Sequence, residues 1–100
     1  MKKEENKFYT YILQCSDNSF YTGYTNNLEN RIKLHNQKKA SKYTRSRTPV
    51  KCVYSKIFNT KNDAMSFEYQ IKQLTRNQKI KLINHIIDYE YVINKKKESI

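Results

Sequence analysis

The sequence predicts a single small α+β domain, in which helices flank a three-stranded antiparallel sheet in the order β-β-α-β-α-α. Three observations predict it. The chain has 100 residues, which is the length of one domain. Its aromatic content of 13%, including nine tyrosines, distinguishes it from disordered chains of similar charge. Strand-like apolar runs also alternate with helical periodicity. We expect the domain at residues 8–93, between a charged extension (1–7) and a basic tail (94–100).

Two strand-like runs at the start of this domain predict a β-hairpin. Residues 8–15 and 20–25 are rich in aromatic and β-branched side chains, and the polar residues 16–19 between them are typical of a turn. A single glycine, Gly23, interrupts the second run. A glycine inside a strand marks either a bulge or a place where another group approaches the backbone closely.

A helix, a basic loop and a third strand are expected next. Asn26 with Glu29 resembles a capping box, which predicts a helix that ends near residue 37 or 38. Residues 38–49 show no periodicity and are expected to form an exposed loop, whereas residues 50–58 have strand composition. One face of the predicted helix carries Leu28, Ile32 and His35.

Two more helices complete the predicted domain. Thr60 can cap the first of them, and Thr75 with Gln78 forms a capping box for the second. The apolar face of the first helix consists of Ala64, Phe67, Ile71 and Leu74. The buried stripe of the second consists of Ile80, Ile83 and Ile87, flanked by Leu82 and Ile86. Residues 88–93 fit either an extension of this helix or a short returning strand.

Several classes of protein are excluded by the sequence. No run of about 18 apolar residues could span a membrane, and residues 1–10 lack the apolar core of a secretory signal. We therefore expect a cytoplasmic protein whose two cysteines, Cys15 and Cys52, are reduced thiols buried in strands. The cysteines and the histidines, His35 and His85, also lack the short spacing of a zinc site.

Positive charge is concentrated in the middle of the chain. No acidic residue lies between Glu29 and Asp63, and this stretch contains Arg31, Lys33, Lys38, Lys39, Lys42, Arg45, Arg47, Lys51, Lys56 and Lys61. Its loop mixes cations with hydroxyl groups and a tyrosine, which can bind phosphate oxygens and stack on bases. A net charge of +11 with a pI near 9.7 therefore predicts a nucleic-acid partner.

Some polar residues lie where apolar ones are expected. Glu68 lies at the apolar edge of its helix, where a carboxylate is costly unless it is paired, as with Lys72 at i+4, or bound to a metal. Arg31 and His35 are one turn apart, and suit either an ordinary helix surface or phosphate binding and proton transfer. The hairpin can bring Tyr11 and Tyr21 together, as a core pair or as part of a site.

These positions together resemble the GIY-YIG nuclease superfamily, and most closely its small stand-alone bacterial YhbQ-like group. The two naming motifs correspond to Tyr9-Thr10-Tyr11 and Tyr21-Thr22-Gly23, followed in order by Arg31, His35 and Glu68. The resemblance includes the segments YILQCSDNSFYTG, KYTRSRTPVKCVYS and FEYQIKQLTRNQKIKLI. The first motif lacks the glycine and isoleucine of the name, and the second has threonine in place of isoleucine.

The resemblance implies a metal-dependent DNA endonuclease that hydrolyses phosphodiester bonds. Glu68 would hold one divalent ion, Mg2+ or Mn2+, and Arg31 would neutralise charge on the phosphate. Tyr11 would orient or deprotonate the attacking water, with His35 and Tyr21 assisting, although any of these three could be the general base. Many family members also carry an asparagine near the metal, for which Asn77 and Asn84 are both candidates.

DNA is the expected partner, in single-stranded, structured or duplex form, and no obligate protein partner is evident. The substrate strand would contact Lys42, Tyr43, Thr44, Arg45, Arg47 and Lys72. The alternative is a non-catalytic nucleic-acid-binding module on the same scaffold, but such a module has no need of a carboxylate facing a basic surface. An RNA-associated protein is a third possibility. A membrane-surface protein comes last, because no helix combines a basic face with large exposed apolar residues.

Overall fold

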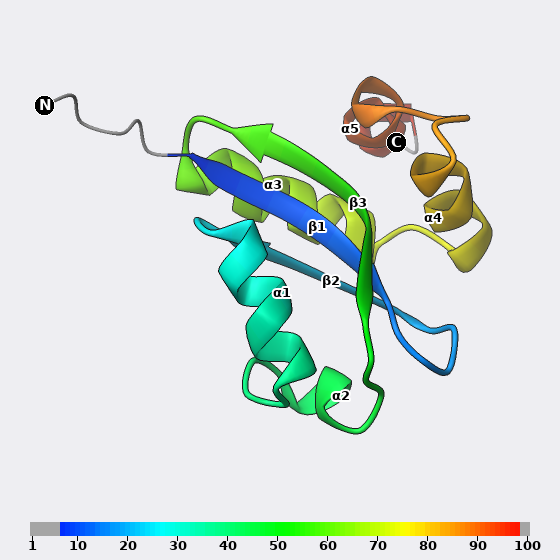
Figure 1. Cartoon of the computed structure of the whole chain (residues 1–100). Helices are drawn as coiled ribbons and strands as arrows, with labels where there is room; N and C mark the ends of the chain where they lie inside the picture. The colour runs from blue at the N-terminus through cyan, green and yellow to red at the C-terminus, as the bar shows by residue number, and fades with distance from the viewer. Residues whose placement is uncertain (1–6, 99–100) are drawn as a thin grey trace, which may run out of the picture.

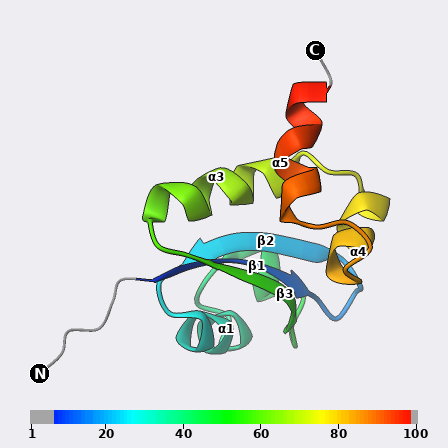
Figure 2. The ribbon, with the colours of Figure 1, turned by 90° about the horizontal axis from the view of Figure 1, so that it is seen from above.

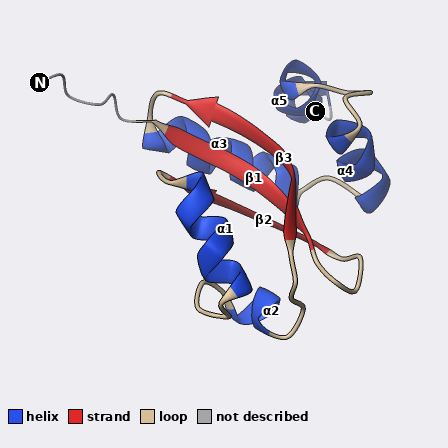
Figure 3. Cartoon of the chain, viewed as in Figure 1, coloured by secondary structure: helices blue, strands red, loops and turns tan. Residues whose placement is uncertain are grey.

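The computed structural model describes residues 7–98, so the predicted extension at residues 1–7 lies almost entirely outside the described residues. Figures 1 and 3 show the strands and helices of this part of the chain. The strands are β1 (Phe8–Gln14), β2 (Phe20–Thr25) and β3 (Lys51–Phe58). The helices are α1 (Leu28–Asn36), α2 (Lys42–Arg45), α3 (Lys61–Lys72), α4 (Arg76–Ile83) and α5 (Tyr89–Glu98).

The strands form one antiparallel sheet in the order β2-β1-β3, so the first strand is the central one. In this register Tyr11 lies opposite Gly23 of β2 and Ser55 of β3. The pairing of β1 with β3 shifts between Ile12 and Leu13. The predicted α+β class, with a three-stranded antiparallel sheet flanked by helices, is confirmed.

Helices cover both faces of this sheet. Figure 2 shows α3 on one side of the strands and α1 on the other. Successive side chains of β1 point to opposite faces, and each face has its own core. Ile12 packs with Phe67 of α3 in the larger core, whereas Tyr11 and Leu13 pack against Ile32 of α1 in the smaller one. The central strand therefore presents Tyr11 on the α1 side of the sheet.

The helix starts agree with the expected caps in two of three cases. The Thr60 hydroxyl accepts a hydrogen bond from the backbone N–H of Asp63, and Thr75 forms the expected reciprocal capping box with Gln78. The first helix differs from the prediction. Its N-cap is Asn27, one residue after the predicted Asn26, because the Asn27 side chain accepts from the N–H of Asn30.

The structure differs from the sequence prediction at two further places. The expected loop contains the short helix α2, which is capped by the Ser41 hydroxyl. The last predicted helix ends at Ile83 instead of continuing to residue 87, because His85 adopts a φ of 61° that interrupts it. Residues 89–98 then form a separate helix, α5, which extends into the expected tail and buries Val92 in the larger core.

The sequence also led to expectations about the two cysteines and about membrane-spanning segments. Both cysteines are free; Cys15 is buried and Cys52 is half-buried. Among the described residues, no helix is both long and apolar enough to cross a bilayer.

The larger core should dominate stability, and α3 offers a matched pair of substitutions to test this. Phe67 is 1% exposed, whereas Met65 on the same helix is 41% exposed. Phe67→Ala should lower the free energy of unfolding by about 3–5 kcal/mol, because it removes transfer energy and leaves a cavity. Met65→Ala should cost less than about 1 kcal/mol. Urea unfolding followed by circular dichroism measures both, and equal losses would contradict this packing.

Candidate active site

A cavity of about 380 Å³ lies beside the edge strand β2. Residues of α1, on one face of the sheet, and of α3, on the other, both line it. The central strand contributes Tyr11, and β2 contributes Tyr21. Helix α1 contributes Arg31, and α3 contributes Glu68. The fold therefore brings together in one cavity four side chains that the sequence proposes as catalytic.

Gly23 makes this arrangement possible. A Cβ atom built on Gly23 would lie 2.6 Å from the hydroxyl oxygen of Tyr11 and 2.8 Å from the ring carbon that bears it. Real Cβ atoms do not approach other atoms so closely, so any side chain here would displace the phenol. Of the two predicted roles for this glycine, the structure shows the close approach. The Tyr11 ring crosses over the β2 backbone to reach the cavity.

His35, the fifth predicted residue, lies behind the cavity wall and is fully buried. Its Nε2 atom is 2.9 Å from the Tyr11 hydroxyl, and its Nδ1 atom is 2.9 Å from the Thr44 hydroxyl. Thr44 is itself fully buried, and its hydroxyl also donates to the Ser41 carbonyl oxygen at 3.5 Å. A hydroxyl has one proton, so a Thr44 hydroxyl that donates to Ser41 can only accept from His35, and Nδ1 of His35 therefore carries the ring proton. The other ring nitrogen, Nε2, is then unprotonated and accepts the hydrogen bond of the Tyr11 hydroxyl.

Burial keeps both members of the Tyr11–His35 pair neutral near pH 7. Burial, together with the smaller effect of the nearby Arg31 charge, lowers the pKa of His35 to about 4. Burial also raises the pKa of Tyr11 well above its usual value. The neighbouring Tyr21 and Glu68 add to this rise, and Arg31 opposes it. The phenol therefore keeps its proton in the free protein, with a neutral imidazole beside it as the acceptor.

Glu68 is the carboxylate of the cavity. Its side chain is 18% exposed, and its Oε2 atom accepts an ion pair from Lys72 Nζ at 2.8 Å. Among residues 7–98 there is no group of three side chains that could hold a metal. A lone carboxylate does not suit zinc, which takes three or four protein ligands. It does suit Mg2+, which keeps several waters and is often held by one carboxylate and a substrate phosphate.

Cations surround this carboxylate. Arg31 of α1 and Lys61, the first residue of α3, both line the cavity. Neither has an ion-pair partner among the described residues. The sequence places Lys61 in the basic stretch, directly after the helix cap Thr60, but does not single it out as a residue of the site. The cavity thus offers two cationic groups to an anionic phosphate.

The residues predicted to contact nucleic acid have different environments. Lys42, Tyr43 and Arg45 are exposed on α2, as expected. Thr44 is not available at the surface, because its hydroxyl is the buried partner of His35. The prediction that it contacts nucleic acid is therefore replaced by a role in holding the imidazole. No periodic signal could have indicated this, because the contact depends on how α2 packs against α1.

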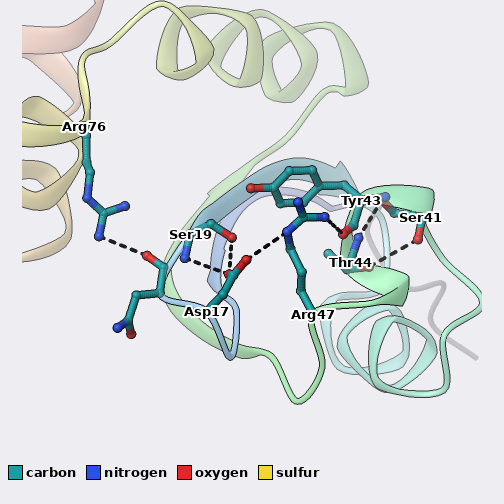
Figure 4. A network of polar contacts seen from close by, with 8 residues as sticks. Asp17, Ser19, Ser41, Tyr43, Thr44, Arg47 and Arg76 are labelled. Carbon is teal, nitrogen blue, oxygen red and sulfur yellow. Dashed lines mark hydrogen bonds and ion pairs between the residues drawn. The ribbon is translucent and has the colours of Figure 1, made fainter.

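Arg47 is engaged within the protein. Its Nε donates to Asp17 at 3.0 Å, its Nη1 donates to the Tyr43 carbonyl oxygen at 2.7 Å, and its guanidinium carbon lies 4.0 Å from the centre of the Tyr43 ring. Figure 4 shows these contacts joining the β1–β2 turn to α2. Arg47 thus fixes the position of Tyr43 as well as presenting charge.

Of the asparagine candidates, neither Asn77 nor Asn84 lines the cavity. Asn84 is instead the C-cap of α4. The asparagine in the cavity wall is Asn26, which follows β2. The sequence predicts a capping role for Asn26 because it lies just before α1, but it also directly follows the edge strand β2 and so reaches the cavity.

Comparison with known proteins agrees with this geometry. The model of the GIY-YIG catalytic domain matches residues 7–81. A UPF0213 protein of Clostridium perfringens is 60% identical over 76% of this chain and 82% of its own length. One of Staphylococcus haemolyticus is 53% identical over 77% of this chain and 94% of its own.

Solved structures show the same relationship. The solution NMR structure of a UPF0213 protein from Bacillus halodurans is 40% identical, with a TM-score of 0.53, and the match covers 89% of this chain and 95% of that one. The match of the domain model over three-quarters of the sequence includes all five predicted catalytic positions. The chain therefore belongs to the GIY-YIG family, whose catalytic domain is of the nuclease type and acts on nucleic acid.

Proposed function

We propose that this protein is a metal-dependent DNA endonuclease that hydrolyses a phosphodiester bond in the cavity between α1 and α3. The observation that carries the proposal is the convergence of three kinds of group in one cavity: a tyrosine with a proton acceptor behind it, a carboxylate, and two unpaired cations among the described residues. A protein that only binds nucleic acid needs the cations alone, since a carboxylate repels phosphate.

Each group has a place in phosphodiester hydrolysis. Arg31 and Lys61 would bind the non-bridging oxygens and offset the charge that grows on them in the transition state. Glu68 would hold a divalent ion, Mg2+ or Mn2+, which when bound supplies positive charge to the phosphate and to the leaving oxygen. Lys72 now occupies one oxygen of this carboxylate, so it would give up that contact.

The attacking water would be oriented by Tyr11. As the water loses its proton to the phenol oxygen, the phenol passes its own proton to Nε2 of His35. This division of roles makes Tyr11 the contact to water and His35 the group that stores the proton, and it proposes an answer to which of Tyr11, Tyr21 and His35 is the general base, a choice the sequence leaves open. Tyr21, whose ring centre lies 5.0 Å from that of His35, would hydrogen-bond the phosphate or the water.

The substrate we propose is DNA in single-stranded or structured form. The net charge of +11 and the exposed cations Lys42 and Arg45 favour a polyanion whose binding depends on salt. Exposed tyrosines beside the cavity, such as Tyr43, favour bases that are free to stack.

Removing the carboxylate should separate cleavage from binding. Glu68→Ala should slow metal-dependent cleavage by at least about 100-fold, because the ion loses its protein ligand. DNA affinity measured in EDTA should stay the same or rise, since a negative charge has been removed. Gel assays on labelled single-stranded, duplex and branched DNA with Mg2+, Mn2+ or EDTA measure cleavage, with the exposed Glu90→Ala in α5 as the control. Binding without cleavage by the wild type on every substrate would favour the non-catalytic module.

Removing the hydroxyl behind the imidazole should affect the turnover rate more than binding. Thr44→Val leaves Nδ1–H of His35 without its acceptor, and should reduce kcat by roughly 10-fold with little change in KM. Thr44→Ser keeps a hydroxyl and should keep most of the activity. The prediction is wrong if the Val variant is as stable to denaturant as the Ser variant and still cleaves at the wild-type rate. Thr44 would then have no part in the proton transfer from Tyr11 to His35.

The neutrality of His35 can be tested through stability. Because burial lowers its pKa from 6.5 to about 4, the unfolded chain binds a proton between these pH values that the folded protein does not. The free energy of unfolding should therefore fall as pH falls through this window, by up to about 3 kcal/mol from this residue. Urea unfolding at several pH values should show a shallower dependence for His35→Gln than for the wild type. The exposed His85→Gln should keep the wild-type slope, and equal slopes for both variants would show that His35 is not the cause.

A further inference from the structure

A second hollow lies beside the cavity and is not used by the chemistry described above. This groove has a volume of about 230 Å³ and is formed by β2, α2, α3 and α4. Its walls are Phe20, Tyr21, Thr22, Tyr43, Lys72 and Lys79. Tyr21 lines both the groove and the cavity, so the two hollows adjoin. Lys72 adds a second link, since it lines the groove and pairs with Glu68 of the cavity at 2.8 Å.

The groove collects positive charge from two helices. Lys72 ends α3 and Lys79 lies in α4, and Arg76 lies one turn before Lys79. Burial, together with the charges of Arg76 and Lys72, lowers the pKa of Lys79. Among the described residues Lys79 and Arg76 form no ion pair. Lys79 and Arg76 have no carboxylate to offset their charges, and a bound anion would relieve the repulsion between them.

The other walls of the groove are fixed in place. The Tyr43 ring stacks near Tyr21, with ring centres 6.0 Å apart and planes 25° apart, and the Arg47 guanidinium lies over it. Arg76 is held away from the groove's centre by its contacts with the Phe20 ring, at 4.5 Å, and with the Asn18 carbonyl oxygen, at 2.9 Å. Lys79 is thus the cation of α4 that lines the groove and is free to bind a ligand.

We propose that this groove binds the phosphate next to the scissile one, with Lys79 and Lys72 as its ligands. The inference rests on the proposed function, because the scissile phosphate is the one in the cavity. The nucleic-acid backbone then passes over Tyr21 from the cavity to the groove, and Tyr43 meets the sugar and base that follow. The strand runs toward α4 along β2, which is an edge strand of the sheet.

Lys79 is the residue to change, because Lys72 also contacts Glu68 and would affect both hollows. Lys79→Gln keeps an unbranched polar side chain, shorter by one atom, and removes a charge from a repelling pair, so the protein should be no less stable than the wild type. Lys81→Gln is the matched control, since it removes an equal charge from an exposed position of the same helix. Binding of a fluorescent single-stranded oligonucleotide in EDTA is measured by anisotropy over a range of salt concentrations.

We expect Lys79→Gln to weaken binding about fivefold or more, and to reduce the slope of log K against log salt by nearly one phosphate contact. Lys81→Gln should have a smaller effect on both. Equal effects of the two variants would mean that only overall charge matters, and would overturn the proposal. This arm does not require cleavage, so it can succeed even if the protein proves not to be a nuclease.

A second arm places the contact along the strand. Oligonucleotides that each carry one neutral methylphosphonate linkage are cleaved by the wild type and by Lys79→Gln with Mg2+ or Mn2+. Neutralising the linkage adjacent to the cleaved bond should slow the wild type several-fold and slow Lys79→Gln less, because that variant has already lost one of the two lysine ligands. If the wild type cleaves but both proteins respond equally at every linkage, the subsite is wrong and the nuclease assignment stands. If the wild type does not cleave while the binding arm succeeds, the groove binds phosphate but the nuclease assignment fails.

Discussion

The site depends on the contact between the Tyr11 phenol and the backbone of Gly23. Tyr11 belongs to the central strand, and its ring can reach the outer edge of β2 only because the residue opposite has no side chain. From there its hydroxyl meets an imidazole of α1 on one side and a cavity that includes α3 on the other. One glycine in the edge strand therefore lets groups from both faces of the sheet act on the same space.

Burial of the hydrogen-bonded pair decides its protonation. In water an imidazole and a phenol would titrate near pH 6.5 and pH 10, but burial moves the two pKa values apart, down for His35 and up for Tyr11. Both groups are therefore neutral over a wide pH range, and in the proposed mechanism the proton would move between them only when charge in the cavity changes. Arg31 lowers the pKa of both groups, so it eases loss of the phenol proton but also makes the imidazole a weaker acceptor. The short helix α2 matters here because it supplies the hydroxyl behind the imidazole.

The features that follow from local chemistry were predictable from the sequence. The hairpin, the caps at Thr60 and Thr75, and the apolar face that includes Phe67 depend on residues close in the chain, and the structure contains them. Features that depend on packing between distant segments were not predictable. The sequence predicts a surface position for Thr44 because its segment has no periodicity, whereas its burial arises from the contact with α1. The end of α4 at Ile83 was missed because the apolar spacing continues through residues that do not remain helical.

The position of one carboxylate among so many cations explains how the two hollows are related. Glu68 lines the cavity together with Arg31 and Lys61. It also forms an ion pair with Lys72, which lines the groove. The opposite charges of the Glu68–Lys72 ion pair nearly cancel, so Lys72 contributes less positive electrostatic potential to the groove than Lys79 does. A divalent ion at Glu68 would compete with Lys72 for the same oxygens and leave the ammonium free. Filling the cavity would then increase the positive charge of the groove, and the two hollows would bind a continuous polyanion more strongly together than either would alone.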